Sequence, residues 1–126
     1  SDMAGDDWLS ILYTLHQKDL KVVGIAVDGT GEAHCDLKTG NDIGAKNALG
    51  LISLAGKEAE NIPVACGSTN PLKGHNEFPA VWRKAADTMQ GNRLPHTSQK
   101  VLTSDAVHLI VSILKNSKKI IINKSR

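Results

Sequence analysis

An α/β fold with an open, mostly parallel sheet and helices on both faces is the fold class that this sequence predicts. Short β-branched apolar runs alternate with segments in which apolar residues recur at helical spacing. The predicted order is helix, strand, helix, strand, helix, helix, strand, and such alternation indicates a parallel sheet. At 126 residues the chain has the size of one ordinary domain.

The first half of the chain carries two predicted helices and one predicted strand. Residues 6–18 form the first helix, with an apolar stripe at Trp8, Ile11, Leu12 and Leu15. The run KVVGIAV at 21–27 is short, β-branched and apolar on both faces, which is typical of a buried parallel strand. The second helix is marked by Ala45, Ala48, Leu49, Ile52 and Ala55, and Gly56 ends it.

The second half begins with the run IPVAC at 62–66, a predicted strand that Gly67 ends. A long polar loop leads into a helix over 80–89, and Pro95 separates it from a helix over 104–116. The chain then finishes in KKIIIN, which we predict to be another buried strand.

Composition excludes several classes of protein. The net charge of +2 and the aromatic content of 3% do not suit a nucleic-acid binder. No apolar run reaches the roughly 18 residues that a membrane span needs. Cys35 and Cys66 make neither a metal-binding pattern nor a disulfide framework, which favours a reducing compartment such as the cytoplasm. The amino end has no signal-peptide profile, and localisation is otherwise not indicated.

The opening stretch SDMAGDDWLS places Asp2, Asp6 and Asp7 within six residues, where the first helix begins. Aspartates in a first helical turn accept backbone N–H bonds and suit the positive end of the helix dipole. Three carboxylates that converge on one loop repel each other unless a hard cation such as Ca²⁺ or Mg²⁺ collects them. Helix capping and metal binding therefore both remain open for these residues.

These residues carry a family resemblance. The stretch from Asp2 to Trp8 resembles the amino-terminal signature of the inosine-uridine preferring nucleoside hydrolase family, an aspartate three residues before an Asp-Asp pair. VVGIAVDGTGEAH is similar to that family's second strand and loop, GAKNALGLISLAG to its second helix, and NIPVACGSTNPL to its third strand and loop. The resemblance covers nearly the whole chain and implies a Rossmann-like nucleoside hydrolase fold.

The resemblance also implies residue roles. Asp2 matches the aspartate that binds Ca²⁺ and takes a proton from the attacking water, and Asp7 matches the acid that grips the ion with both oxygens. Asp6 matches the acid that contacts the ribose hydroxyls. Thr30 stands where the family usually has an asparagine that contacts ribose, so a sugar contact by Thr30 is an expectation on which the chain departs from the pattern.

The resemblance further implies that residues 1–126 are part of a larger domain, without its opening strand and its carboxyl-terminal half. In the intact protein we expect Ca²⁺-dependent hydrolysis of ribonucleosides to ribose and free base, as in purine and pyrimidine salvage. The expected partner is a small nucleoside, with no nucleic acid or membrane, in a protein that can be a homo-oligomer. The fragment alone is expected to be inactive. The alternatives are a Mg²⁺-dependent phosphoryl-transfer or receiver-like domain, and a non-catalytic remnant.

Among the histidines, the sequence singles out His75, which follows the carboxyl end of a predicted strand. It either approaches the nucleobase or is a solvated loop residue. The sequence shows no partner for His34 in its loop, and Trp82 is expected to anchor the helix that contains it.

Overall fold

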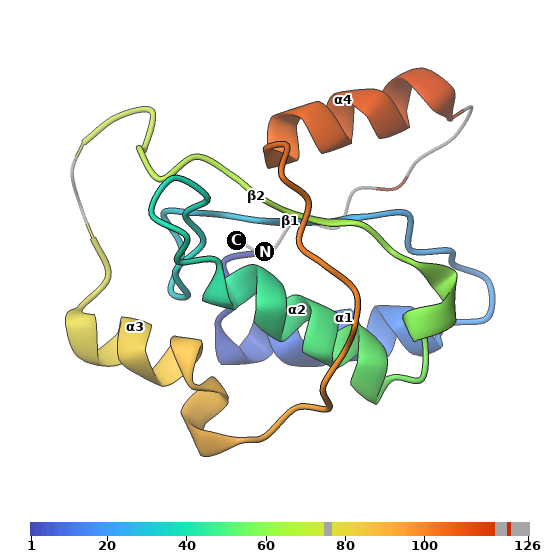
Figure 1. Ribbon diagram of the computed structural model, residues 1–126, viewed down its shortest axis with the longest axis horizontal. Coiled ribbons are helices and arrows are strands. Elements are labelled where there is room, and N and C mark those ends of the chain that lie inside the picture. Colours follow the sequence, from blue (N-terminus) through green and yellow to red (C-terminus); the bar gives the residue numbers. More distant parts are fainter. Residues whose placement is uncertain (75–76, 118–120, 122–126) are drawn as a thin grey trace.

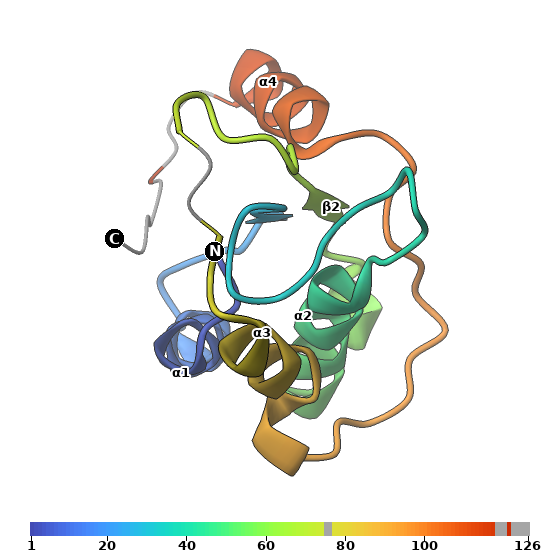
Figure 2. The same ribbon diagram turned by 90° about the vertical axis from the view of Figure 1, so that its left-hand side faces the viewer.

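A small parallel sheet lies between two layers of helices in the computed structural model, which describes residues 1–74, 77–117 and 121. The strands are β1 (Ile25–Val27) and β2 (Val64–Cys66). Figure 1 shows helix α4 (Ala106–Asn116) on one face of the sheet, and α1 (Gly5–His16) and α2 (Ile43–Leu54) on the other. The end-on view in Figure 2 separates the three layers and places α3 (Ala80–Asp87) beside α2. The α/β class is therefore confirmed.

The two strands pair in parallel, with Ile25 opposite Val64 and Val27 opposite Cys66. Successive side chains of a strand point to opposite faces. Ile25 and Val27 accordingly belong to the larger core with α1 and α2, whereas Ala26 packs against the smaller cluster that includes Leu109 of α4. Both faces of β1 therefore pack against apolar residues, as the apolar run at 21–27 predicted.

The predicted helices are confirmed to within a few residues at each end. The predicted third helix is divided, because α3 ends at Asp87 and a short 3₁₀ turn, η2 (Met89–Gly91), follows it. A second 3₁₀ turn, η1 (Glu58–Glu60), follows α2. Gly56, the predicted helix stop, has a φ of +70°, a conformation in which glycine avoids the steric cost of a Cβ.

The strands are shorter than predicted. Pairing starts where the Ile25 amide donates to the Pro63 carbonyl, so residues 21–24 lie outside β1, and β2 starts at Val64 rather than at Ile62. The predicted strand at 118–123 lies outside the described residues except for Ile121, which is exposed and not in a strand. An open sheet of more than two strands is therefore a prediction that the described residues do not test.

The outer edges of both strands are partly occupied. The Ser1 amino group donates to the Ala26 carbonyl at 3.1 Å, and the Asp28 amide donates to the Ser1 carbonyl at 2.7 Å. This is the bonding pattern of one rung in a parallel ladder, so Ser1 occupies a strand position beside β1. On the other edge, the Leu102 amide donates to the Val64 carbonyl at 2.9 Å.

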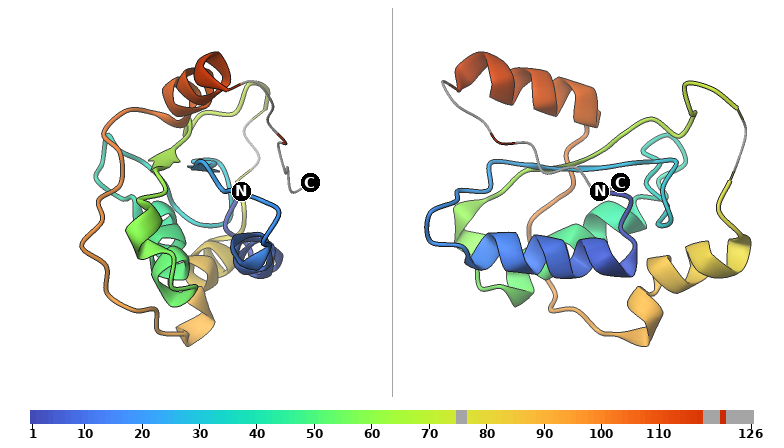
Figure 3. Two further views of the ribbon diagram at one scale, coloured as in Figure 1. Left: turned by 90° about the vertical axis from the view of Figure 1, so that its right-hand side faces the viewer. Right: turned by 180° about the vertical axis from the view of Figure 1, so that it is seen from behind.

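Several large apolar side chains face solvent on the outer helices. Figure 3 shows α4 on one side of the sheet and α1, in the same layer as α2 and α3, on the other. The exposed side chains on α1 and α4 are Leu9, Tyr13, Val107, Ile110, Val111 and Leu114. None of the helices in the described ranges is long and apolar enough to cross a membrane.

Candidate active site

Asp7 organises the loop that precedes α1. Its Oδ2 atom accepts hydrogen bonds from the Ser1 hydroxyl at 2.8 Å, the Asp2 amide at 2.7 Å and the Met3 amide at 3.0 Å. The carboxylate is buried, with 3% of the residue exposed. An ionised carboxylate only accepts hydrogen bonds, so a buried one needs donors in place of the water molecules it has lost. The three donors to Oδ2 serve this purpose. The loop of residues 1–4 is thus folded around Asp7.

Met3 closes this loop with an unusual backbone conformation. Its φ is +61°, in the left-handed region that residues with a side chain seldom adopt. The side chain is fully buried in the core, and the Met3 carbonyl accepts a hydrogen bond from the Trp8 indole at 2.7 Å. Such strain persists only where surrounding contacts impose it. Trp8 and Asp7 supply those contacts here.

Asp2 lies beside Asp7, and its charge is unfavourable there. Burial, the hydrogen bond and charge of Asp7, and the charge of Glu32 all raise the pKa of Asp2, although the Ala4 amide donates to Asp2 Oδ1 at 3.0 Å and opposes the rise. A pair of neighbouring carboxylates favours either a shared proton or a bound cation. The pair thus has the chemistry of a partial cation site.

The three acids predicted to converge do so only in part. Asp6 is exposed, and no donor among the described residues bonds to its carboxylate. Over residues 1–74, 77–117 and 121, no group of three or more acidic, histidine or cysteine side chains is placed to hold a metal ion. Of the three acids, the described residues bring only Asp2 and Asp7 together.

The capping interpretation is also only partly correct. The residue at the N-cap position of α1 is Ala4, which offers no side-chain hydrogen bond, and Asp7 binds donors that precede the helix. Both Asp6 and Asp7 still lie in the first turn, where a negative charge interacts favourably with the helix dipole. Their benefit to α1 is electrostatic rather than that of a cap.

The loop after β1 lies directly against Asp2. The Ala33 amide donates to the Asp2 carbonyl at 3.1 Å, and a Cβ built on Gly31 would come within 2.6 Å of Asp2 Cα. Only glycine permits this approach. Thr30 is next to Gly31 and therefore lies near the loop of residues 1–4, which we call the acidic loop. The Thr30 hydroxyl, however, donates to Asp28 Oδ1 at 2.9 Å and so points toward Asp28.

A small cavity opens beside the same loop. Its volume is about 320 Å³, and it is lined by Gly5, Trp8, Glu32, Trp82, Ala85, Ala86 and Gln90. The prediction that Trp82 anchors its helix is wrong, because the residue is 55% exposed and faces this cavity. The cavity is also lined by α1 and by the loop after β1, and these two elements carry Asp6, Asp7 and Thr30.

His34 and Asp87 form a hydrogen-bonded pair that the sequence did not reveal. His34 Nδ1 lies 2.7 Å from Asp87 Oδ2, so the expectation of a loop histidine without a partner is wrong. The two residues are 53 positions apart, and no local pattern links them. His75, which the sequence singled out, lies outside the described residues.

The cysteine interpretation is wrong as well. Cys35 and Cys66 form a disulfide bond that joins the loop after β1 to the end of β2. Both residues are buried, and parallel strands bring their carboxyl ends to the same edge of the sheet. Two cysteines in a chain of this size carry no spacing signal, so only the strand pairing could have indicated the bond.

Comparisons with known proteins identify a family. The family model described as inosine-uridine preferring nucleoside hydrolase matches residues 1–123, which is nearly all of the chain. No curated protein and no solved structure matches the chain. The match includes residues 1–7, the loop after β1 and α3.

Proposed function

Because the chain belongs to the inosine-uridine preferring nucleoside hydrolase family, we propose that the intact protein hydrolyses the N-glycosidic bond of ribonucleosides with Ca²⁺ as cofactor. The family assigns nucleoside hydrolysis in general, which is a glycosidase reaction on a small nucleoside. The products are ribose and free base, which suits purine and pyrimidine salvage. The family match favours this activity over phosphoryl transfer and receiver function.

The pairing of Asp2 with Asp7 is the observation that carries the proposal. Burial and two neighbouring acids raise the pKa of Asp2, so a cation would relieve a repulsion already present. Carboxylate oxygens are the ligands that Ca²⁺ prefers. The residues therefore fit part of a Ca²⁺ site, in which Asp2 and Asp7 would be ligands.

Each acid receives a separate role in this proposal. Ca²⁺, when bound, supplies positive charge that lowers the pKa of a nearby water. Asp2 accepts the proton of that water as general base. Asp7, whose Oδ2 atom accepts three hydrogen bonds from its loop, would be a second ligand of the ion. Asp6, exposed at the start of α1, binds the ribose hydroxyls with help from Thr30.

The 126-residue chain alone is proposed to be inactive. Two carboxylate residues are fewer than the six to eight oxygen ligands that Ca²⁺ takes, so affinity for the ion should be weak. Titration calorimetry on this chain should show no submicromolar Ca²⁺ binding. Tight binding that Asp7→Ala abolishes would mean that the described residues already complete the site.

Three variants of the intact protein test the assigned roles. Asp2→Asn keeps the shape of the side chain but removes the proton acceptor, so turnover should fall by at least ~10²–10⁴-fold and added Ca²⁺ should not restore it. Asp7→Ala should lose the ion and unfold the loop of residues 1–4. Asp6→Ala should keep Ca²⁺ binding and weaken both sugar binding and turnover.

Base release from inosine and uridine, measured beside thermal stability, separates these outcomes from a purely structural role. If the acids only stabilise α1, each variant loses about 0.5–2 kcal/mol of stability and activity per folded molecule is unchanged. Near-normal turnover in a folded Asp2→Asn protein would therefore overturn the mechanism.

A further inference from the structure

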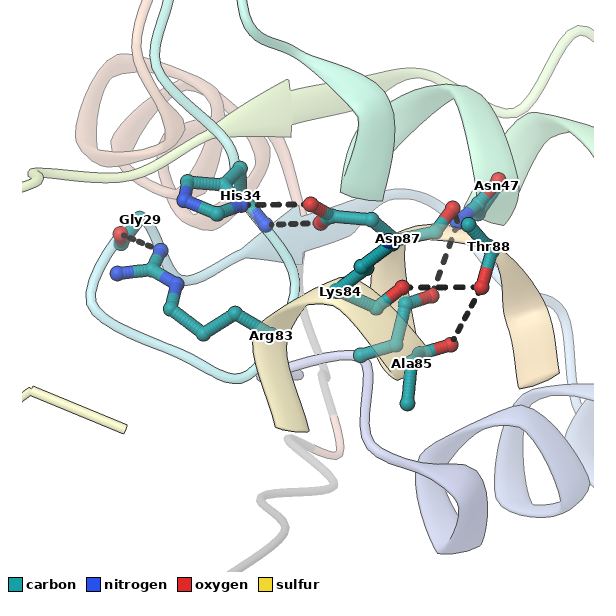
Figure 4. A network of polar contacts seen from close by, with 9 residues as sticks. Gly29, His34, Asn47, Arg83, Lys84, Ala85, Asp87 and Thr88 are labelled. Atoms are coloured by element: carbon teal, nitrogen blue, oxygen red, sulfur yellow. Dashed lines mark hydrogen bonds and ion pairs between the residues drawn. The ribbon is translucent and has the colours of Figure 1, made fainter. Parts of the chain in front are cut away.

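His34 and Asp87 meet through two contacts at once. The His34 amide donates to Asp87 Oδ1 at 2.8 Å, and His34 Nδ1 lies 2.7 Å from Asp87 Oδ2 (Figure 4). Because an ionised carboxylate only accepts, Nδ1 carries the proton in this contact. The Asp87 side chain, at the end of α3, thus fixes both the backbone and the ring orientation of His34. The pair is partly buried, with 38% and 22% of the two side chains exposed.

The backbone of Asp87 is hydrogen-bonded to α2. Asn47, a buried residue of α2, donates from Nδ2 to the Asp87 carbonyl at 3.0 Å and to the Ala86 carbonyl at 3.4 Å. Figure 4 shows Asn47 on the opposite side of Asp87 from His34. The contact to His34 therefore connects the loop to the helical layer rather than to a free helix end.

Residues 28–34 connect this anchor to the acidic loop. Ala33, next to His34, donates its amide to the Asp2 carbonyl, and Gly31 packs against Asp2 with no room for a Cβ. Near the start of the segment, Arg83 of α3 approaches the Gly29 carbonyl, with Nη2 at 3.5 Å. A displacement of His34 is therefore transmitted to the backbone of Asp2 through a single residue.

We propose that His34 and Asp87 are positioning residues, which hold the segment 28–34 against the acidic loop and thereby fix Asp2 and Thr30 for the reaction. This inference rests on the proposed function, in which Asp2 is the general base. Neither residue needs to touch the substrate. The effect is geometric, because a small misplacement of a catalytic group is sufficient to slow an enzyme greatly.

Two substitutions of His34 separate positioning from direct chemistry. Asparagine places an amide N–H near the location of Nδ1, so His34→Asn preserves the bond to Asp87. Glutamine reaches the location of Nε2 instead and loses that bond. In the intact protein, His34→Asn should keep kcat/KM within a few-fold of wild type. His34→Gln and Asp87→Ala should lower it about 10–100-fold, the usual range for residues that orient catalytic groups.

Amide hydrogen exchange supplies a readout that does not depend on activity. The amides of Ala33 and His34 are donors in two of the bonds that hold the segment, so Asp87→Ala should accelerate exchange across residues 29–34. His34→Gln should have a smaller effect, because it keeps the backbone bond to Asp87. His34→Asn should exchange at the wild-type rate.

The chain offers a matched control on the other face of the sheet. His108 also contacts one aspartate through its amide and Nδ1, both 2.9 Å from Asp105 Oδ1, but this pair is exposed at the start of α4. Asp105→Ala and His108→Gln remove the same chemistry without touching the segment 28–34. They should alter stability and leave kcat/KM unchanged.

The outcomes that overturn the proposal are distinct from failure of the proposed function. If His34→Gln kept full activity and His34→Asn lost it, Nε2 rather than Nδ1 would be the important atom. His34 would then take part directly in the reaction instead of positioning other residues. Wild-type kcat/KM and exchange in folded Asp87→Ala would show that the pair positions nothing. If the wild type released no base from any nucleoside, the proposed function would fail, and unchanged exchange in Asp87→Ala would still refute the anchor.

Discussion

Asp2 lies in a place where its ionised carboxylate is unfavourable for the fold. Its pKa is raised above the ordinary value of 3.8, first by burial and then by Asp7 and Glu32. Folding therefore favours the protonated form of Asp2 relative to the unfolded chain. This contribution to stability is fully present below the pKa of the unfolded state and is lost as pH rises through the higher folded-state pKa. At neutral pH an ionised Asp2 destabilises the fold in the absence of a cation.

Asp2→Asn should consequently raise the melting temperature at pH 7 in the presence of a chelator, while it abolishes turnover. The gain should shrink as pH falls through the raised pKa of Asp2, because the wild-type residue then becomes protonated. Asp105 provides the opposite case, since bonds from His108 lower its pKa. Its contribution is present above the unfolded-state pKa and is lost as pH falls, so Asp105→Asn should be destabilising at pH 7. Melting curves between pH 3.5 and 8 test both signs, and a lower melting temperature for Asp2→Asn at pH 7 would contradict the argument.

Gly31 sets the distance between the two loops of the site. A Cβ at this position would lie 2.5 Å from Asp2 Cβ, and the obstructing Asp2 atoms belong to or adjoin the backbone, so they cannot rotate away. Gly31→Ala should therefore push Asp2 aside, cost about 1–3 kcal/mol of stability and reduce kcat/KM by about 10²-fold. Gly5→Ala is the matched control, because the nearest atoms to its new Cβ are 3.9 Å away. Equal effects of the two substitutions would show that the loops adjust freely.

The sequence indicated the acids of the site but not the residues that support them. Asp2, Asp6 and Asp7 lie within one short stretch, so their proximity follows from chain connectivity alone. Asp87 reaches His34 across 53 residues, and Cys66 reaches Cys35 across 31. Such contacts depend on how β1, β2 and α3 are arranged in space, and a single sequence carries no periodic signal for that arrangement.

At the scale of elements, helices were predicted more accurately than strands. The stripe of Trp8 and Leu15 specifies α1 locally, because a helix satisfies its own backbone hydrogen bonds. A strand ends where its neighbour ends, and the described neighbours of β1 are β2 and the single residue Ser1. The apolar run at 21–27 therefore exceeds the length of β1, although its residue types were interpreted correctly.

The start of α1 shows why capping and metal binding could not be separated from the sequence. Either interpretation requires an acid beside a helix N-terminus, and the two differ only in what the acid faces. Asp7 faces back toward residues 1–3, which its Oδ2 atom holds in place. A carboxylate that shapes a loop in this manner can also present an oxygen to an ion, whereas an ordinary cap turns toward the helical amides.

For the molecule as a whole, α1 and α4 lie on opposite sides of the sheet, and both helices carry exposed apolar side chains. Surfaces of this kind commonly mark contacts with other protein parts. The larger domain that the family resemblance implies would account for such faces. The sequence predicted the layered α/β class from alternation, but it could not predict how many strands the described residues would pair.

The bond between Cys35 and Cys66 turns part of the polypeptide into a covalent ring that encloses the whole of α2. The exposed turn at Lys38, Thr39 and Gly40 lies within that ring. A single tryptic cut after Lys38 should thus open the ring without dividing the molecule. The nicked protein should migrate as one species without reductant and as two fragments with it. Separation without reductant would show that the ring is not closed. Once cut, the two parts of the chain would share no peptide connection, and yet β1 and β2 would remain in one molecule through the disulfide bond.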